Sequence, residues 1–239
     1  MSSEQTIFSR TELLLGEELM ERISSARVIL FGVGGVGSWC AESLVRSGIK
    51  NLTIVDYDRV CVTNINRQLV ATTQTIGQVK VEVLRRRLLE INPDAGITAI
   101  QEMYSAENSS LFDIASYDYV IDAIDSLKNK TELILETTRT DAKLYSSMGA
   151  ALKSDPSRIA VSEFWKVRGC PLAAALRRRM KKGDRPAKKF LCVYSEELLE
   201  NKGESLSEGR ANGTLVHSTA IFGFTLAGLV IQDIIKQNN

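Results

Sequence analysis

The sequence predicts an α/β protein with a doubly wound, mostly parallel sheet. The first observation is that strand-like and helix-like segments alternate through residues 1–150, which is typical of parallel strands covered by helices. The second is a glycine-rich loop between the first strand and the next helix, with the sequence Gly32-Val33-Gly34-Gly35-Val36-Gly37. The third is a change of rhythm beyond Gly149, where we expect a C-terminal extension instead of another strand–helix repeat.

Short β-branched and apolar runs, bounded by glycines, prolines or acidic residues, predict the strands of this sheet. Five of these runs lie in the first 150 residues, and two more flank a basic stretch in the extension. The predicted strands are residues 27–31, 51–55, 96–101, 117–121, 142–147, 158–164 and 190–194.

Apolar residues at helical spacing predict the helices between these strands. The clearest case is the run Val79, Val83, Leu84, Leu88 and Ile91, which ends where Asn92-Pro93 stops the helix. Other helices are predicted at residues 11–23, 36–47 and 126–138.

The final apolar run, residues 214–235, is predicted to be a buried C-terminal helix. It is long enough to raise the question of a membrane span, but it carries polar and charged residues such as His217, Gln232 and Asp233. Stable membrane anchoring is therefore the minor alternative. His217 is the only histidine, and a lone histidine in an apolar helix is not assigned a role as a base.

Composition indicates an ordinary globular protein with one sizeable core, since 44% of the 239 residues are hydrophobic and 25% are charged. The cysteines are widely separated, form no C-x-x-C pair and follow no secretory signal pattern. A reducing cytoplasm fits best, and a four-cysteine zinc site is not expected. The four are Cys40, Cys61, Cys170 and Cys192.

Charge is distributed unevenly although the whole chain carries only +1. Residues 166–189, here called the basic segment, contain ten basic residues and one acidic residue, so this segment is +9 and the rest of the chain is −8. Such asymmetry favours a dedicated surface for an anionic partner. The basic residues are Lys166, Arg168, Arg177, Arg178, Arg179, Lys181, Lys182, Arg185, Lys188 and Lys189.

The glycine loop is predicted to hold the phosphates of a nucleotide in a Rossmann-like turn. Gly32 permits the tight turn, Gly34 lets a phosphate approach the backbone, and Gly37 allows the helix to pack closely on the strand. Asp56, at the end of the second strand, is placed to bind a ribose hydroxyl pair. Asp58 is either a second ligand or a solvated turn acid, and the pattern so far equally describes an NAD-binding protein.

Cations after Asp56 favour a triphosphate over a dinucleotide. A triphosphate carries more charge, and its α-phosphate must become electrophilic while pyrophosphate departs. Arg67 and Lys80 would compensate that charge. Asp125, just past the fourth strand, is a candidate Mg²⁺ ligand, because magnesium takes one or two protein carboxylates together with phosphate oxygens. The alternative for Asp125 is an N-cap of the following helix.

These motifs together resemble the superfamily of ubiquitin-activating-type enzymes, which includes the adenylyltransferases of molybdopterin and thiamine synthesis. The resemblance implies that the glycine loop, including Gly35, and Asp56 hold ATP, and that Asn64, Arg67 and Lys80 contact its ribose and phosphates. It also implies Mg²⁺ at Asp125. Arg10 matches an arginine that in this superfamily reaches the ATP of a dimer partner, its alternative being a solvated arginine at a helix start.

Within the superfamily, the sequence of the chain is similar to those of the branch that dehydrates threonylcarbamoyladenosine in tRNA. The similar stretches run from Arg10 to Gly16, from Gly37 to Glu42 and from Val60 to Gln68, with later matches after Pro171 and Val193. Paired C-x-x-C motifs and a recognisable thioester cysteine, which other branches add, are missing. Cys170 departs from the branch, where an acidic residue is expected.

The resemblance implies an adenylating enzyme over residues 1–239, with an ATP-binding part at 1–150 and a tRNA-facing extension at 151–239. A threonine carboxylate would attack the α-phosphate of ATP, and a nitrogen of the same substituent would then close a ring, because intramolecular attack needs positioning more than a nucleophile. The basic segment then has tRNA as its partner, with a solvated charged helix as the alternative. A homodimer is expected, and a sulfur-relay or other accessory protein is left open.

Overall fold

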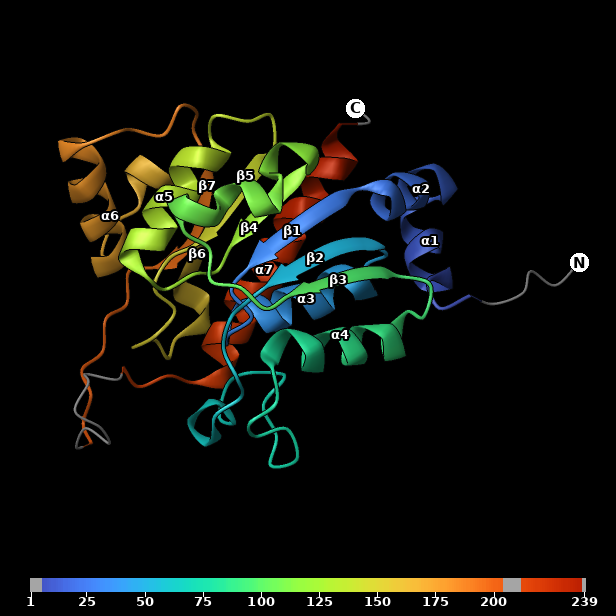
Figure 1. The fold of residues 1–239 in the computed structure, drawn as a ribbon, viewed down its shortest axis with the longest axis horizontal. Helices are drawn as coiled ribbons and strands as arrows, with labels where there is room; N and C mark the ends of the chain where they lie inside the picture. Colours follow the sequence, from blue (N-terminus) through green and yellow to red (C-terminus); the bar gives the residue numbers. More distant parts are fainter. Residues whose placement is uncertain (1–5, 204–211, 238–239) are drawn as a thin grey trace, which may run out of the picture.

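One seven-stranded sheet organises the molecule, in the order β3-β2-β1-β4-β5-β7-β6 (Figure 1). The computed structural model describes residues 6–203 and 212–237. All pairs are parallel except β6 with β7, so the predicted doubly wound, mostly parallel sheet is confirmed. The strands are β1 (Arg27–Phe31), β2 (Asn51–Val55), β3 (Gly96–Ile100), β4 (Tyr119–Asp122), β5 (Lys143–Ser147), β6 (Ile159–Glu163) and β7 (Leu191–Ser195).

Helices cover both faces of the sheet. On one face lie α3 (Gly37–Arg46), α4 (Lys80–Ile91) and α7 (Val216–Lys236), and on the other lie α5 (Leu127–Thr137) and α6 (Pro171–Lys182) (Figure 1). Two short helices, α1 (Ser9–Leu15) and α2 (Glu17–Ser25), precede β1. Short 3-10 helices complete the connections at Val62–Asn64, Ala106–Phe112, Ile114–Ser116, Pro156–Arg158 and Phe164–Lys166.

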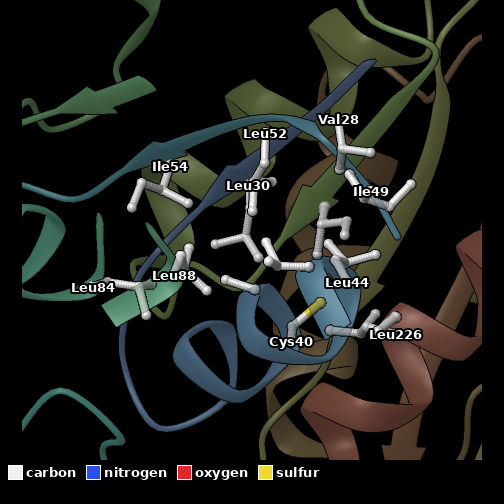
Figure 2. Packing of buried hydrophobic residues seen from close by; sticks show 14 of the residues in the cluster. Val28, Leu30, Cys40, Leu44, Ile49, Leu52, Ile54, Leu84, Leu88 and Leu226 are labelled. Atoms are coloured by element: carbon white, nitrogen blue, oxygen red, sulfur yellow. The ribbon is translucent and has the colours of Figure 1, made fainter. Parts of the chain in front are cut away.

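Alternation along the strands sends apolar side chains to two cores. Leu30 of β1 and Ile54 of β2 point toward α3, α4 and α7, where they meet Leu44, Leu88 and Leu226 (Figure 2). All five side chains are fully buried. The opposite core lies beneath α5 and α6. Because parallel strands buried on both faces need helices on both sides, these two cores account for the alternation seen in the sequence.

The helix predicted over residues 11–23 is wrong as a single element. Gly16 has φ +81° and separates α1 from α2, since this left-handed region is open to glycine and cannot continue a helix. Leu13 and Leu14 are 89% and 81% exposed, and α1 buries no residue. Apolar spacing there therefore marks an exposed apolar surface instead of a core-facing helix.

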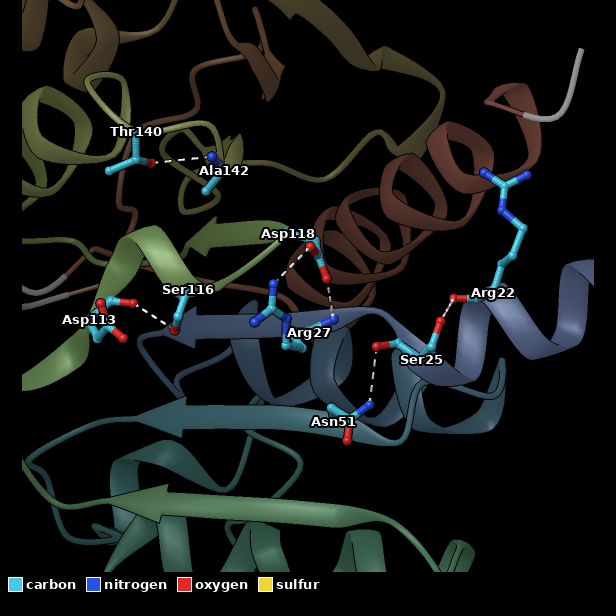
Figure 3. A network of polar contacts seen from close by, with 9 residues as sticks. All are labelled: Arg22, Ser25, Arg27, Asn51, Asp113, Ser116, Asp118, Thr140 and Ala142. Carbon is cyan, nitrogen blue, oxygen red and sulfur yellow. Dashed lines mark hydrogen bonds and ion pairs between the residues drawn. The ribbon is translucent and has the colours of Figure 1, made fainter.

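Polar contacts join the segments at the amino end of β1. The carboxylate of Asp118 accepts hydrogen bonds from the Arg27 amide at 2.8 Å and from its guanidinium at 3.4 Å (Figure 3). The side chain of Asn51 donates to the carbonyls of Ser24 and Ser25. These bonds fasten the end of α2 and the start of β4 to this edge, so that the carboxyl ends of the strands remain for binding.

The C-terminal helix α7 packs on α3, with Phe222, Leu226 and Val230 fully buried. By length and composition it is one helix that could cross a membrane, and half of its most apolar window is buried inside the protein. The expected buried C-terminal helix is therefore present. It begins at Val216, two residues after the predicted start.

Candidate active site

A cleft of about 820 Å³ opens at the carboxyl ends of β1, β2, β3, β4 and β5. In open α/β sheets this edge is where ligands bind, because loops from neighbouring strands converge there. Its walls come from the glycine loop, the segments that follow β2, β3, β4 and β5, and the start of α6 and α7. The predicted site residues that line it are Gly32, Gly34, Gly35, Asp56, Asp58, Asn64, Arg67, Lys80 and Asp125.

The glycine loop is shaped by close backbone approaches. Gly32 has φ +91°, and a Cβ there would lie 2.6 Å from the carbonyl oxygen of Ala123. A Cβ on Gly37 would lie 1.8 Å from the carbonyl oxygen of Gly32. At Gly34, by contrast, the nearest atom would be the Gln68 amide nitrogen at 3.8 Å, so the loop is open on its cleft side. An anion can therefore approach this backbone closely.

Asp56 ties the glycine loop to the segment after β2. One carboxylate oxygen accepts the Val33 amide at 2.6 Å, and the other accepts the Asp58 amide at 2.8 Å. The carboxylate is thus fixed by backbone donors at the mouth of the cleft. Its predicted bond to a ribose would be made from this fixed position.

Lys80 is held in the cleft by Asp58. Its ammonium lies 2.8 Å from the Asp58 carboxylate, and the Lys80 amide donates to the Asp58 carbonyl. Only 4% of Lys80 is exposed. Burying an ammonium group without a partner would cost free energy, and the carboxylate of Asp58 offsets that cost. Asp58 therefore anchors the lysine, a contact that neither sequence-based interpretation of Asp58 included.

Arg67 and Asn64 come from the connection between β2 and α4. The Arg67 guanidinium donates to the Thr63 carbonyl at 2.8 Å and to the Asn66 side chain at 3.0 Å. The Asn64 side chain accepts the amide of Cys61 at 3.0 Å. Local hydrogen bonds thus position both groups at the cleft, and the remaining guanidinium donors of Arg67 suit a planar, bidentate partner.

Asp125 is an exposed carboxylate of the cleft near two other acids. The pKa of the Tyr57 phenol is raised, first by the charge of Asp58, then by burial and by the charges of Asp125 and Asp56. Three carboxylates thus gather at this end of the cleft. Within the described residues, no cluster of three His, Cys, Asp or Glu could hold a metal alone. These residues fit a magnesium ion whose other ligands are phosphate and water oxygens.

The alternative role of Asp125 as a helix cap is wrong. The N-cap of α5 is Ser126, and it makes no side-chain hydrogen bond to the helix. The carboxylate of Asp125 is therefore not engaged in capping, which leaves it directed to solvent and the cleft.

Two predicted residues do not line the cleft of their own chain. Gly37 is buried behind the loop, where it allows the close packing described above. Arg10 is exposed on α1 and is not among the cleft residues. A role for Arg10 would therefore have to be played in another copy of the chain.

The polar cleft residues that sequence reasoning missed include Gln68, Asn129 and Thr219. Gln68 is 7% exposed, and its side-chain oxygen is buried without a hydrogen-bond partner among the described residues. Gln68 lies beside Arg67 in the sequence and could have been suspected from that. Thr219 belongs to α7, and only the fold brings it against Gly35.

The fold and the cleft define a nucleotide-binding α/β protein whose glycine loop, cations and carboxylates suit a phosphorylated ligand. The model of the ThiF family matches residues 8–239, and the chain belongs to this family.

Similar proteins point to one branch of the family. The chain is 38% identical over 236 residues to a tRNA threonylcarbamoyladenosine dehydratase of Haemophilus influenzae, with 92% of this chain and 90% of the relative covered. It is 42% identical over 175 residues to the protein of that name from Bacillus subtilis, covering 73% and 69%. The structure of the Escherichia coli tRNA N6-threonylcarbamoyladenosine dehydratase in complex with ATP superposes on this chain with a TM-score of 0.88 and 35% sequence identity. The match covers 97% of this chain and 94% of the Escherichia coli chain.

Proposed function

We propose that this protein is an ATP-dependent enzyme that dehydrates the threonylcarbamoyl group of threonylcarbamoyladenosine in tRNA. The observation that carries the proposal is a single cleft that joins the open glycine loop with Lys80, Arg67 and Asp125, and whose wall includes Leu172 at the start of the basic helix α6. A nucleotide and a polyanionic substrate can therefore meet in one place. The function of the similar dehydratases supports the choice of substrate.

The reaction proceeds in two steps. The threonine carboxylate attacks the α-phosphate of ATP, which gives an acyl-adenylate and releases pyrophosphate. A nitrogen of the same substituent then attacks the activated carbonyl, closes a ring and expels AMP. The oxygen lost from the carboxylate leaves on AMP, so the nucleoside loses one water overall. Because both groups belong to one substituent, positioning replaces a covalent enzyme intermediate.

Residues of the cleft would stabilise the charge that moves during the first step. Arg67 and Lys80 compensate the negative charge on the α-phosphate and the departing pyrophosphate. Asp125 would hold Mg²⁺ together with phosphate oxygens, and this ion supplies further charge compensation. Asp56 binds the ribose, and Asn64 contacts the nucleotide from the adjacent loop.

The basic segment would bind the tRNA backbone. Helix α6 buries Ala173, Leu176 and Met180 against the core and exposes cations on its other side. Its first turn reaches the cleft, so tRNA lying along this helix can deliver a nucleotide to ATP. We propose residues 1–150 as the ATP-binding part and residues 151–239 as the tRNA-facing extension of one enzyme that acts in the cytoplasm.

The enzyme would act as a homodimer in which Arg10 completes the partner's site. Arg10 lies outside the cleft of its own chain, on a helix whose exposed Leu13 and Leu14 form an apolar surface suited to a second copy. Co-expressing Arg10→Ala and Lys80→Ala chains tests this. In random mixing, half of the dimers are mixed and each has one intact site, so about a quarter of the wild-type activity is expected. If Arg10 acts within its own chain, the mixture has no activity.

The nucleoside mass tests the function itself. The protein is incubated with ATP, Mg²⁺ and tRNA carrying threonylcarbamoyladenosine. The tRNA is then digested to nucleosides, and their masses are measured by mass spectrometry. We expect the loss of one water from that nucleoside and none when ATP is omitted. A folded, ATP-binding protein that leaves the mass unchanged refutes the dehydratase. Pyrophosphate exchange stimulated by a small carrier protein ending in Gly-Gly, and not by tRNA, would identify a sulfur-carrier adenylyltransferase instead.

A further inference from the structure

The loop that carries Asp125 is fastened by a buried ion pair that the proposed chemistry does not use. Lys130 of α5 and Asp122 at the end of β4 are both completely buried, and their charged groups lie 2.8 Å apart. Lys130 lies in the first turn of α5, after Asp125 in the sequence, and its side chain points back to the carbonyl of Ile124 beneath the loop. The pair therefore lies directly under the segment that leads to the cleft.

Two hydrogen bonds and the ion pair close a ring through Ile124, and a third hydrogen bond holds Asp122 from the neighbouring strand. The second carboxylate oxygen of Asp122 accepts the Ile124 amide at 3.1 Å, and the Lys130 ammonium donates to the Ile124 carbonyl at 3.0 Å. The hydroxyl of Ser146, at the end of β5, donates to Asp122 at 2.7 Å. Both polar atoms of Ile124 are thus fixed to one ion pair, and the next residue along the chain is Asp125.

Neighbouring contacts hold the other side of the same loop. The Ala123 amide donates to the Phe31 carbonyl at 2.8 Å, and the Ala123 carbonyl approaches Gly32 so closely that a Cβ there would be 2.6 Å away. The loop of residues 123–125 therefore contacts the glycine loop at Ala123 and carries Asp125 at its other end. Because Ala123 is held separately by β1, a change at the ion pair would act on the Ile124–Asp125 side of the loop.

A buried ion pair is an expensive way to stabilise a fold, because removing two charges from water costs about as much as their attraction returns. Apolar residues of similar size commonly serve as well or better. The hydrogen bonds to Ile124 supply a specific geometry that apolar packing would not. This points to a positioning role for the pair.

We propose that Lys130 and Asp122 position Asp125 for Mg²⁺–ATP binding, an inference that rests on the proposed role of Asp125. Lys130 touches no ligand in this scheme and acts only through the Ile124–Asp125 backbone. Outer-shell residues that orient a metal ligand typically change metal affinity about 10- to 100-fold when they are replaced. The charge-neutral replacement of the pair should therefore raise the Mg²⁺ requirement and leave metal-free ATP binding nearly unchanged.

The test compares the double variant Asp122→Asn/Lys130→Met with wild type by calorimetric ATP titration at a series of Mg²⁺ concentrations. Replacing both partners leaves no uncompensated buried charge, so the variant should fold. We expect the Mg²⁺ concentration for half-maximal tight binding to rise about 10- to 100-fold, while ATP affinity without Mg²⁺ changes less than about threefold. An unchanged Mg²⁺ requirement in the folded double variant overturns the positioning role.

Three further variants separate the possible failures. Lys128→Met removes an exposed lysine of the same helix that pairs with Glu107 and Glu132, and it should leave the Mg²⁺ requirement unchanged. Ser146→Ala removes one hydrogen bond to Asp122 and gives a milder rise, which keeps the test available if the double variant does not fold. Asp125→Asn tests the underlying proposal alone. If it too leaves the Mg²⁺ requirement unchanged, the assignment of Mg²⁺ to Asp125 fails, independently of Lys130.

Discussion

At the scale of single residues, the cleft pairs its deepest cation with a carboxylate before any nucleotide arrives. Lys80 is nearly inaccessible and Asp58 is half exposed, so the pair lies at the boundary between core and solvent. A cation held in this way needs little reorganisation when a phosphate approaches. The roles of the cleft residues that the sequence proposed remain predictions, and the following variants test them.

Replacing Lys80 should weaken ATP binding. Lys80→Met keeps the length of the side chain and removes its charge, and we expect a loss of about 1.5–3 kcal/mol, or roughly 10- to 100-fold in affinity. The matched control is Arg86→Met, which removes an exposed cation from the same helix outside the cleft. Calorimetric titration with ATP measures both. Equal affinities for the two variants would remove Lys80 from the binding site.

Glu197 should make the fold sensitive to acid. Its carboxylate accepts hydrogen bonds from the Asp155 and Ser154 amides and the Ser154 hydroxyl, which lower its pKa from 4.5 to about 2. A lowered pKa contributes stability above the unfolded-state value, and the contribution is lost as pH falls from 4.5 through about 2. Urea unfolding across this range should therefore be less pH-dependent for Glu197→Gln. An equally steep dependence in both proteins contradicts the assignment.

Sequence motifs located residues that line the cleft, whose roles remain predictions, and missed contacts between segments that are distant in the sequence. The glycine loop, Asp56, Arg67 and Lys80 could be placed at the cleft because they lie in the connections that follow β1 and β2 or at the start of the next helix. The Lys130–Asp122 pair and the contact of Thr219 with the loop could not be predicted, because no spacing in the sequence reports which helix folds over which strand.

At the scale of elements, the sequence located every strand of the sheet, with β1 and β2 predicted to the residue. For the other predicted elements the differences are one or two residues at the ends, where helices fray and apolar patterns lose their period. Helix α6 was not predicted, because its charged residues hide the apolar face formed by Ala173, Leu176 and Met180. The larger error is the split at Gly16, since Leu13, Leu14 and Leu15 mimic a core-facing helix. An exposed apolar surface and a core face have the same pattern until the fold is known.

We expect some cations of helix α6 to bind tRNA and others to stabilise the fold. Arg178 and Arg179 are exposed, whereas Arg177 lies over the Phe164 ring at 5.9 Å and donates to the Phe164 carbonyl. We expect Arg178→Ala/Arg179→Ala to weaken tRNA binding. The slope of log K against log salt concentration should become shallower by about one for each lost phosphate contact. Arg177→Ala should instead lower stability by about 1–3 kcal/mol and keep the salt dependence.

Filter binding of tRNA at several salt concentrations, with urea unfolding of each variant, checks this division. The single-residue control lies within the same helix, so a general loss of helix structure would affect all three positions alike. A salt dependence that falls most for Arg177→Ala would place the tRNA surface elsewhere.

At the scale of the whole molecule, the last helix supports the first loop. A Cβ on Gly223 of α7 would lie 2.5 Å from the Val36 carbonyl and 2.8 Å from the Cys40 amide, so α7 and α3 are in backbone contact. The two segments are far apart in the sequence, and from their contact we predict that ATP binding depends on the integrity of the C-terminal helix. The fold class and the family were predictable from the sequence, but this contact between α7 and α3 was not.

Gly223→Ala should therefore lower both stability and ATP affinity. Separating two packed helices costs about 1–3 kcal/mol, and the movement displaces Val36 in the glycine loop. Gly228→Ala, in the same helix, meets no atom within 4 Å and should stabilise by about 0.5–1 kcal/mol. Urea unfolding and ATP titration of the two variants measure these effects. Stability lost without any loss of ATP affinity would show that the helix and the loop are not coupled.

The fate of one oxygen atom tests the adenylation chemistry most directly. Threonylcarbamoyladenosine in tRNA is prepared with ¹⁸O in the threonine carboxylate and incubated with the protein, ATP and Mg²⁺, and the released AMP is analysed by mass spectrometry. If the carboxylate attacks the α-phosphate, each AMP formed from fully labelled substrate carries one ¹⁸O. Unlabelled AMP, or ¹⁸O in phosphate or pyrophosphate, would contradict an acyl-adenylate and with it the proposed function of the cleft.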